Sequence, residues 1–202
     1  MEAFTTLHAV AMPFDQVNVD TDQITPARFL AKPRPVQAEN VFRDLRYDAN
    51  GKPVPDFPMN IPAYNGARIL VGNKNFGCGS SRETAVSSLV DNGFRAFIAP
   101  SFGDIFFNNC FQNGALPICL PDERVAEIRA QLHASPGAEL FIDLEAQSVR
   151  SPDGREDRFD IDPFRKECLL KGVDEIGLTL GYDADIKAFE QKQAREEAWL
   201  DI

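Results

Sequence analysis

One run of glycine, hydroxyl and charged residues is the part of this sequence best suited to chemistry: Asn75-Phe76-Gly77-Cys78-Gly79-Ser80-Ser81-Arg82-Glu83. Gly77 and Gly79 allow the backbone to turn tightly and to approach a ligand closely. Free N–H groups at a helix start favour an anion. The Arg82 guanidinium adds a planar fork that suits a carboxylate or a phosphate. The run therefore predicts an anion-binding loop.

Two common phosphate-binding motifs do not fit this run. A dinucleotide fingerprint needs a third glycine where Arg82 stands, and a Walker A loop needs a Gly-Lys-Ser/Thr sequence, whereas no lysine follows Gly79. Ser80 and Glu83 also match the S-x-x-E capping box, so a purely structural helix cap is the alternative for this run.

Alternating strand and helix signals surround the run. Apolar segments predict strands at 4–14, 68–71, 95–99, 116–120, 140–144 and 158–161. Helices are expected at about 80–91 and 102–113, after a cap at Asp122, from Asp162-Pro163 to Gly172, and in a charged tail at 184–199. This alternation is typical of βαβ units, so we predict an α/β fold, and the length favours one domain.

The segment 32–62 interrupts this regular pattern. It holds six of the 14 prolines and turn pairs such as Asn50-Gly51, so we predict irregular structure there. Long ordered connections of this kind are more often functional than decorative.

Charge and composition exclude several classes of function. The net charge is −10 and the basic residues are scattered, which argues against nucleic-acid binding. No apolar run approaches the ~18 residues of a membrane span, and residues 1–14 lack the basic region of a signal peptide. We therefore expect a cytoplasmic protein without membrane association.

Four segments of the sequence resemble one known family. Residues 79–83 (GSSRE) are similar to the signature of the swivelling domain of the aconitase superfamily. Residues 18–24 (NVDTDQI), 99–106 (APSFGDIF) and 161–168 (IDPFRKEC) match small subunits of isopropylmalate isomerases in the same order. The resemblance implies an aconitase-like swivelling β/β/α domain across 1–202, with a substrate loop near 28–62 and a C-terminal helical tail near 184–202.

The resemblance also implies a reaction and its residues. Members of this family are hydro-lyases that interconvert 2-isopropylmalate and 3-isopropylmalate in leucine biosynthesis by dehydration and rehydration, and they work only with a large subunit. In the family the first serine of the signature, here Ser80, is the base, acting as an alkoxide. Ser81 and Arg82 would hold a carboxylate of the small dicarboxylate substrate.

The substrate loop is carried over from the family in the same way. Phe29 and Leu30 fall where an aromatic–leucine pair contacts the variable side chain of the malate, and Arg34 lies near a second carboxylate-binding arginine. Arg28 competes with Arg34 for that role. Ordinary loop packing and solvated charge are the alternative for these positions.

We expect no cofactor or metal on this chain. Iron–sulfur ligation needs several convergent thiolates, but Cys78, Cys110, Cys119 and Cys168 have no motif spacing. The [4Fe–4S] cluster that the resemblance implies is therefore expected on the large subunit. His8 and His133 adjoin no motif. Asp20 and Asp22 suggest a metal pair, although turn capping within their own loop explains them as well.

Two departures from the family leave the substrate open. The family usually has a histidine where Thr84 stands, and residues 32–36 read KPRPV instead of an Arg-Thr-Gly stretch. A related malate derivative, of the methylmalate or homoaconitate type, is therefore the alternative substrate. A non-catalytic anion-binding module with the same fold is the alternative from another class.

Overall fold

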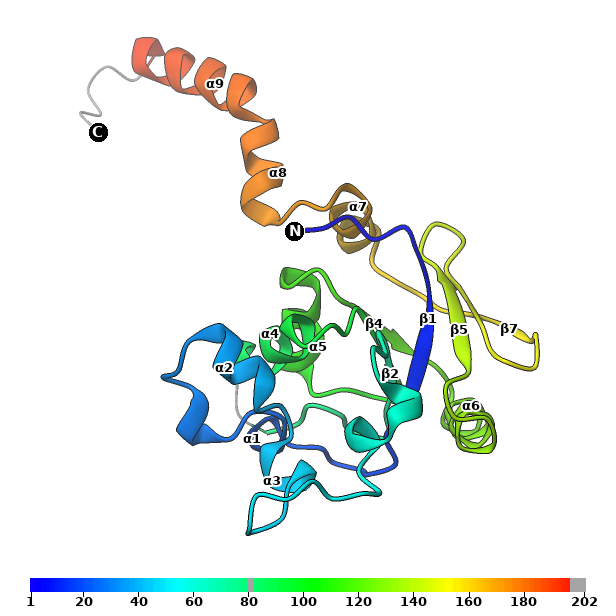
Figure 1. Ribbon diagram of the computed structural model, residues 1–202. Coiled ribbons are helices and arrows are strands. Elements are labelled where there is room, and N and C mark those ends of the chain that lie inside the picture. Colours follow the sequence, from blue (N-terminus) through cyan, green and yellow to red (C-terminus); the bar gives the residue numbers. More distant parts are fainter. Residues whose placement is uncertain (80–81, 197–202) are drawn as a thin grey trace.

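A seven-stranded sheet with the strand order β4-β3-β2-β1-β5-β6-β7 organises the chain in the computed structural model, which describes residues 1–79 and 82–196. The strands are β1 (Thr6–Pro13), β2 (Ile69–Val71), β3 (Ala96–Ala99), β4 (Leu116–Cys119), β5 (Glu139–Asp143), β6 (Ser148–Arg150) and β7 (Glu156–Arg158). Strands β1 to β4 run parallel, whereas β5, β6 and β7 continue from β1 as an antiparallel meander (Figure 1). Strand β1 thus joins two kinds of pairing.

Helices cover both faces of the parallel half. The side chains of α4 (Glu83–Asp91) and α5 (Asp104–Gln112) pack with Leu70 and Phe97 in one hydrophobic core. Helix α6 (Asp122–Ala134) packs on the opposite face in a second core. Neighbouring residues on a strand point to opposite faces, so the short strands β2 and β3 are apolar throughout.

The prediction of irregular structure at 32–62 is only partly right, because short helices and 3-10 turns occupy much of this segment. These are α2 (Arg34–Glu39), α3 (Arg43–Arg46), and the 3-10 turns η2 (Pro58–Asn60) and η3 (Pro62–Tyr64). They follow α1 (Thr21–Ile24) and η1 (Ala27–Phe29). Prolines lie in the first turns of α2, η2 and η3, where a missing N–H costs nothing.

Two predicted helix starts are wrong. Helix α4 begins at Glu83 with Arg82 as its N-cap residue, three residues after the predicted start. Helix α6 has Pro121 at the N-cap position, and Asp122 is already helical. The Asp122 carboxylate instead pairs with Lys74 at 2.8 Å. A cap motif in sequence is only local, and the Asp122 motif did not set the start of α6.

The second half of the chain matches the predictions in part. Helix α7 (Pro163–Lys171) begins with Asp162, whose side chain accepts a hydrogen bond from Arg165 N, and ends at Gly172 with a left-handed φ of 67°, as predicted. The predicted strand at 158–161 is displaced: β7 ends at Arg158. Strand β6 was not predicted, and β7 has the polar sequence Glu-Asp-Arg, which carries no strand signal.

The C-terminal arm consists of α8 (Glu175–Gly181) and α9 (Asp183–Glu196) and extends away from the sheet and its helices (Figure 1). The helical tail is confirmed from Asp183 to Glu196. Helix α8 was missed because it contains Gly177 and Gly181, which disfavour helix. Within the described part of the chain, no helix is both long and apolar enough to cross a membrane.

Candidate functional site

The run predicted to bind an anion lies at the carboxyl edge of the parallel strands, where loops after β1, β2 and β3 meet. We call residues 72–82, which follow β2, the signature loop. Its Cys78 N–H donates to Val19 O at 3.0 Å, and its Cys78 carbonyl accepts from Thr21 N at 2.9 Å. On the other side, Phe76 pairs by its backbone with the 101–103 segment after β3. The signature loop is therefore held from both sides by main-chain hydrogen bonds.

Two glycines of this loop are required by their surroundings. Gly77 has a φ of +72°, and a Cβ there would lie closer than 3.0 Å to the buried ring of Phe106. Gly79 has a φ of +94°, and a Cβ there would lie closer than 3.0 Å to the carboxylate of Asp20. Any other residue would be strained at both positions and would push the loop away from its neighbours.

Arg82 directly precedes α4 and directs its guanidinium at Asp22 of α1. The two form an ion pair, with the Arg82 side chain 21% exposed and the Asp22 side chain 50% exposed. Arg82 is thus a partly buried cation whose ion-pair partner is accessible to solvent. An incoming carboxylate can take the place of Asp22 or share the guanidinium with it, since the fork has five donors.

Asp20 caps a turn in its own loop, as predicted, and the Asp22 carboxylate pairs with Arg82. The Asp20 side chain accepts from Asp22 N at 2.6 Å, while the Gln23 side chain accepts from Asp20 N at 3.1 Å. This reciprocal capping box fixes α1. Because α1 is fixed, the Asp22 carboxylate is presented to Arg82.

Arg34 is engaged elsewhere. Its guanidinium makes two hydrogen bonds of 2.8 Å to the carboxylate of Asp91, and these raise the pKa of Arg34 above its usual value. Asp91 ends α4, about 13 Å along the helix from Arg82 at 1.5 Å per residue. The structure therefore does not bring Arg34 to Arg82, and substrate binding by Arg34 stays a prediction.

Phe29 and Leu30 form part of a turn that is folded back on α2. Both side chains are half-buried, the Arg28 guanidinium lies 4.7 Å from the centre of the Phe29 ring, and the Leu30 carbonyl accepts from the Gln37 side chain at 3.0 Å. Arg28 itself pairs with Asp44. The contact of Phe29 and Leu30 with substrate stays a prediction.

Ser80 and Ser81, the predicted base and one predicted carboxylate ligand, lie outside the described residues. Thr84, which stands where the family usually has histidine, is half-buried in the first turn of α4.

The cysteines come from separate elements: Cys78 from the signature loop, Cys110 from α5, Cys119 from β4 and Cys168 from α7. Burial raises the pKa of the Cys78 thiol, and the nearby Asp20 charge raises it further. Burial also raises the pKa of Cys110 well above its usual value. Among the described residues no group of three or more His, Cys, Asp or Glu side chains could hold a metal ion, so these residues do not fit a cluster.

Sequence reasoning missed one pair of residues that shapes this edge. Asn18 and Asn75 both have left-handed φ values, 53° and 57°, and the Asn75 amide donates to the Asn18 side-chain oxygen at 2.9 Å. Asparagine tolerates this conformation better than most residues. The asparagines at positions 18 and 75 were therefore the signal that the sequence offered.

The order of strands, the helices on both faces and the arginine loop at the carboxyl edge define an aconitase-type swivelling domain. The family model described as "Aconitase C-terminal domain" matches residues 1–123, and "LeuD_N" matches 126–163. The model for the C-terminal domain of the small subunit of 3-isopropylmalate dehydratase matches residues 175–202. The chain belongs to the family of 3-isopropylmalate dehydratase small subunits.

Similar proteins support the same assignment over the whole length. The 3-isopropylmalate dehydratase small subunit of Parvibaculum lavamentivorans is 51% identical over 99% of this chain and 100% of its own length. That of Neisseria meningitidis serogroup B is 49% identical over 99% of each chain. A crystal structure of 3-isopropylmalate dehydratase from Methanocaldococcus jannaschii is similar with a TM-score of 0.65 and 25% identity, covering 93% of this chain and 99% of that one.

Proposed function

We propose that this chain is the small subunit of a hydro-lyase that interconverts 2-isopropylmalate and 3-isopropylmalate in leucine biosynthesis, and that it works in the cytoplasm with a large, cluster-binding subunit. Residues 1–202 act as one swivelling domain. The observation that carries the proposal is Arg82: a partly buried guanidinium at the start of α4 whose ion-pair partner, Asp22, is half exposed. Full-length similarity to named small subunits supports the reaction type.

In this proposal the chain binds the substrate and moves a proton. Arg82 and Ser81 hold one carboxylate of the malate. Ser80 removes the proton from the carbon beside a carboxylate, a very weak acid, as the hydroxyl leaves the adjacent carbon. On rehydration the hydroxyl adds to the first carbon, and the proton goes to the carbon that lost the hydroxyl. The positive guanidinium stabilises the negative charge that develops on the carboxylate. A [4Fe–4S] cluster, when bound to the large subunit, would supply a Lewis-acid iron for the departing hydroxyl.

Asp22 acts as a positioning residue in this scheme. It holds the Arg82 guanidinium toward the edge of the sheet while the site is empty. Arg34 is the proposed second carboxylate ligand, and it must exchange Asp91 for substrate to fill that role.

The test for Arg82 is Arg82→Lys in the assembled enzyme. Lysine keeps the charge but loses the bidentate fork, so we expect kcat/KM to fall by about 100-fold or more while the melting temperature is kept. Arg158→Lys is the control, because Arg158 is an exposed arginine of β7. Near-normal kcat/KM in Arg82→Lys would reject the binding role.

The test for Ser80 separates a base from a helix cap. Arg82 is the N-cap residue of α4, so Ser80→Gly should leave the stability of α4 almost unchanged. We nevertheless expect turnover to collapse, because glycine has no hydroxyl to accept the proton. A parallel loss of stability and activity would make Ser80 structural only.

The identity of the alkyl group is tested at Leu30. One methylene in an apolar pocket is worth about 1–3 kcal/mol, so discrimination between isopropylmalate and methylmalate should be modest, and Leu30→Ala should reduce it. An unchanged preference ratio would remove Leu30 from the pocket. A wild-type enzyme that prefers methylmalate outright would favour the alternative substrate class.

A further inference from the structure

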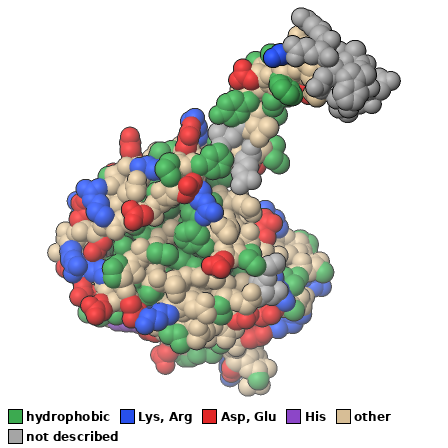
Figure 2. Space-filling view, turned by 180° about the vertical axis from the view of Figure 1, so that it is seen from behind, with side chains coloured by type: hydrophobic (Ala, Val, Ile, Leu, Met, Phe, Trp, Pro, Cys, Tyr) green, Lys and Arg blue, Asp and Glu red, His purple; other side chains and the backbone are tan. Residues whose placement is uncertain are grey.

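The C-terminal arm exposes a line of large hydrophobic side chains. Ile176 and Leu180 are four residues apart on α8, and Ile186 and Phe189 are three apart on α9, so each pair shares a helix face, with Tyr182 between them. The exposed fractions run from 39% to 71% for Ile176, Leu180, Tyr182, Ile186 and Phe189. Hydrophobic side chains lie along the arm, outside the rounded body, in Figure 2. We call these five residues the arm face.

The size of the arm face matches that of a protein interface. With roughly 200 Å² for each full side chain, the exposed fractions leave roughly 600 Å² of mostly apolar surface. Monomeric proteins seldom leave more than a few hundred Å² of contiguous apolar surface open to water. A standard interface buries about 800 Å² on each partner, so the arm face and its surroundings are large enough for a stable complex.

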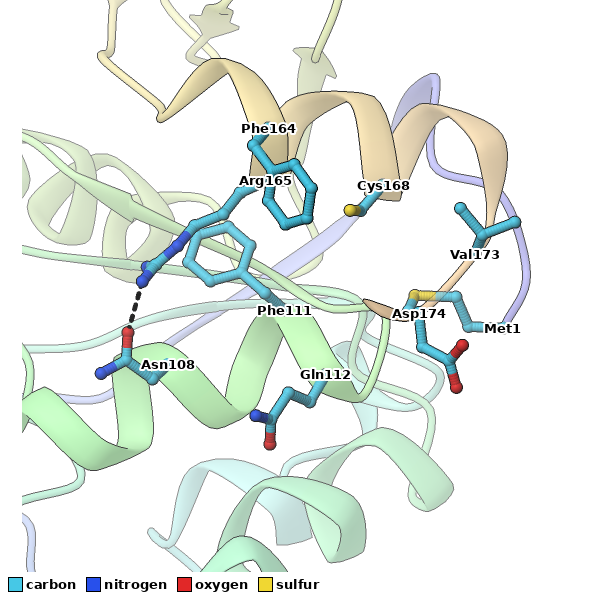
Figure 3. A pocket seen from close by; sticks show the side chains of 9 residues that line it. All are labelled: Met1, Asn108, Phe111, Gln112, Phe164, Arg165, Cys168, Val173 and Asp174. Atoms are coloured by element: carbon cyan, nitrogen blue, oxygen red, sulfur yellow. Dashed lines mark hydrogen bonds between the residues drawn. The ribbon is translucent and has the colours of Figure 1, made fainter. Parts of the chain in front are cut away.

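A cleft lies at the base of the arm. This cleft has a volume of about 410 Å³ and lies between α5, α7 and the start of the arm. Figure 3 shows Phe164 and Val173 beside it, with the Arg165 guanidinium turned to Asn108. Phe164 is 51% exposed, and Asp174 lies on the rim. The cleft, lined by Phe111, Phe164 and Val173 together with polar side chains, offers a second place near the arm for a partner's side chain.

Charge decides which partner fits. Exposed carboxylates on Asp185 and Glu190 lie on the same helix as the arm face, Asp183 pairs there with Lys187, and the whole chain carries a net charge of −10. A second copy would bring the same negative charge to the same surface, and like charges disfavour that contact. The better partner presents an apolar stripe flanked by Lys or Arg side chains, and the three- and four-residue spacings suit a helix lying along the arm.

We propose that the arm face docks onto the large subunit, on an apolar helix or groove edged with basic residues. This inference rests on the proposed function, because it assumes that a large subunit exists. It assigns the arm an assembly role, separate from the chemistry at Arg82. Because the arm face lies outside the site, altering it should weaken subunit affinity and leave turnover in the formed complex intact.

The test is the affinity of the full-length chain for its large subunit with two matched variants. Phe189→Asp places a charge on the arm face, whereas Gln191→Asp places the same charge two residues on, on the opposite side of α9, where the side chain is exposed. We expect Phe189→Asp to raise the Kd about 30-fold, the size of a hot-spot substitution. Gln191→Asp should stay within about 2-fold of the wild type, since it lies at most on the rim of an interface.

Activity separates this proposal from the proposed function. With the large subunit in saturating excess, Phe189→Asp should recover the wild-type kcat. An unchanged Kd in Phe189→Asp would overturn the docking role. So would a wild-type chain that self-associates through the arm, seen as a dimer that only Phe189→Asp abolishes while the large-subunit Kd stays the same. If the subunits bind but turn over no isopropylmalate, the proposed function fails and the docking surface stands.

Discussion

The signature loop and the C-terminal arm are built in opposite ways. The loop is joined to both neighbouring loops by main-chain hydrogen bonds. Two of its glycines leave no room for a Cβ, because Gly77 lies against Phe106 and Gly79 against Asp20. The arm has its large side chains in solvent and an ion pair four residues apart, Lys187 with Asp183. A residue that must hold a substrate to within fractions of an ångström needs the first kind of support. A surface that a partner protein covers, as we propose for the arm face, does not need this internal support before the partner binds.

The largest expected effect is at the signature loop. Gly77→Ala puts a Cβ against the Phe106 ring at a left-handed φ, so overpacking and backbone strain add. We expect the free energy of unfolding to fall by about 4 kcal/mol in denaturant titration. Gly66→Ala is the control: Gly66 has a similar φ of +74° but open space around it, so its loss reports strain alone. Equal losses in both variants would mean that the Phe106 contact contributes nothing.

A buried ion pair in the body comes next. Arg124 on α6 is 4% exposed and bonds to Asp157 at 2.7 Å and to Glu127 at 2.9 Å. Arg124→Met leaves these carboxylates without their buried partner, and we expect a loss of about 3 kcal/mol. Arg158→Met, at an exposed pair on β7, should cost under about 0.5 kcal/mol. Similar losses from both variants would show that burial does not set the difference.

The pH dependence of stability should reveal a smaller contribution in the 28–62 segment. The hydrogen bonds from Arg28 lower the pKa of Asp44 below its usual value. Because the unfolded carboxyl binds its proton more readily, this contribution is present above an unfolded pKa of about 3.9 and is lost as the pH falls through the lower folded pKa. The pair is exposed, so we expect less than about 1 kcal/mol.

The measurement compares wild type with Asp44→Asn in denaturant titrations across the acid range. The gap in unfolding free energy should shrink as the pH falls. In an Arg28→Met background, the same comparison should lose most of this pH dependence. A gap that widens on acidification would reverse the assigned sign.

The smallest expected effect is in the arm. Gly181 is the last residue of α8, and a Cβ added there by Gly181→Ala would have nothing within 4 Å. Alanine favours helix over glycine by up to about 1 kcal/mol. We expect slower amide hydrogen exchange in α8 and no change in the global melting temperature. A rise in melting temperature comparable in size to the loss in Gly77→Ala would show that the arm unfolds together with the sheet.

The sequence alone determined the features that depend on neighbouring residues. The apolar runs predicted β1 to β5, the Asp162-Pro163 and Gly172 pair predicted both ends of α7, and the residues 79–83 pointed to the family. These signals work because a strand, a cap or a tight turn is set mainly by side chains within a few positions. They failed where the local signal was weak, as in the polar strand β7 and the glycine-containing α8.

Only the tertiary structure decided which charges meet. Arg82 pairs with Asp22 across 60 positions, and Arg34 pairs with Asp91 across 57. With 21 Lys and Arg residues and 31 Asp and Glu residues, any cation had many possible partners in the sequence. The pairing follows from the folding of α1 beside the signature loop, which main-chain hydrogen bonds join, and from the packing of α2 along α4. Coulomb attraction depends on distance in space, and the sequence does not carry that distance.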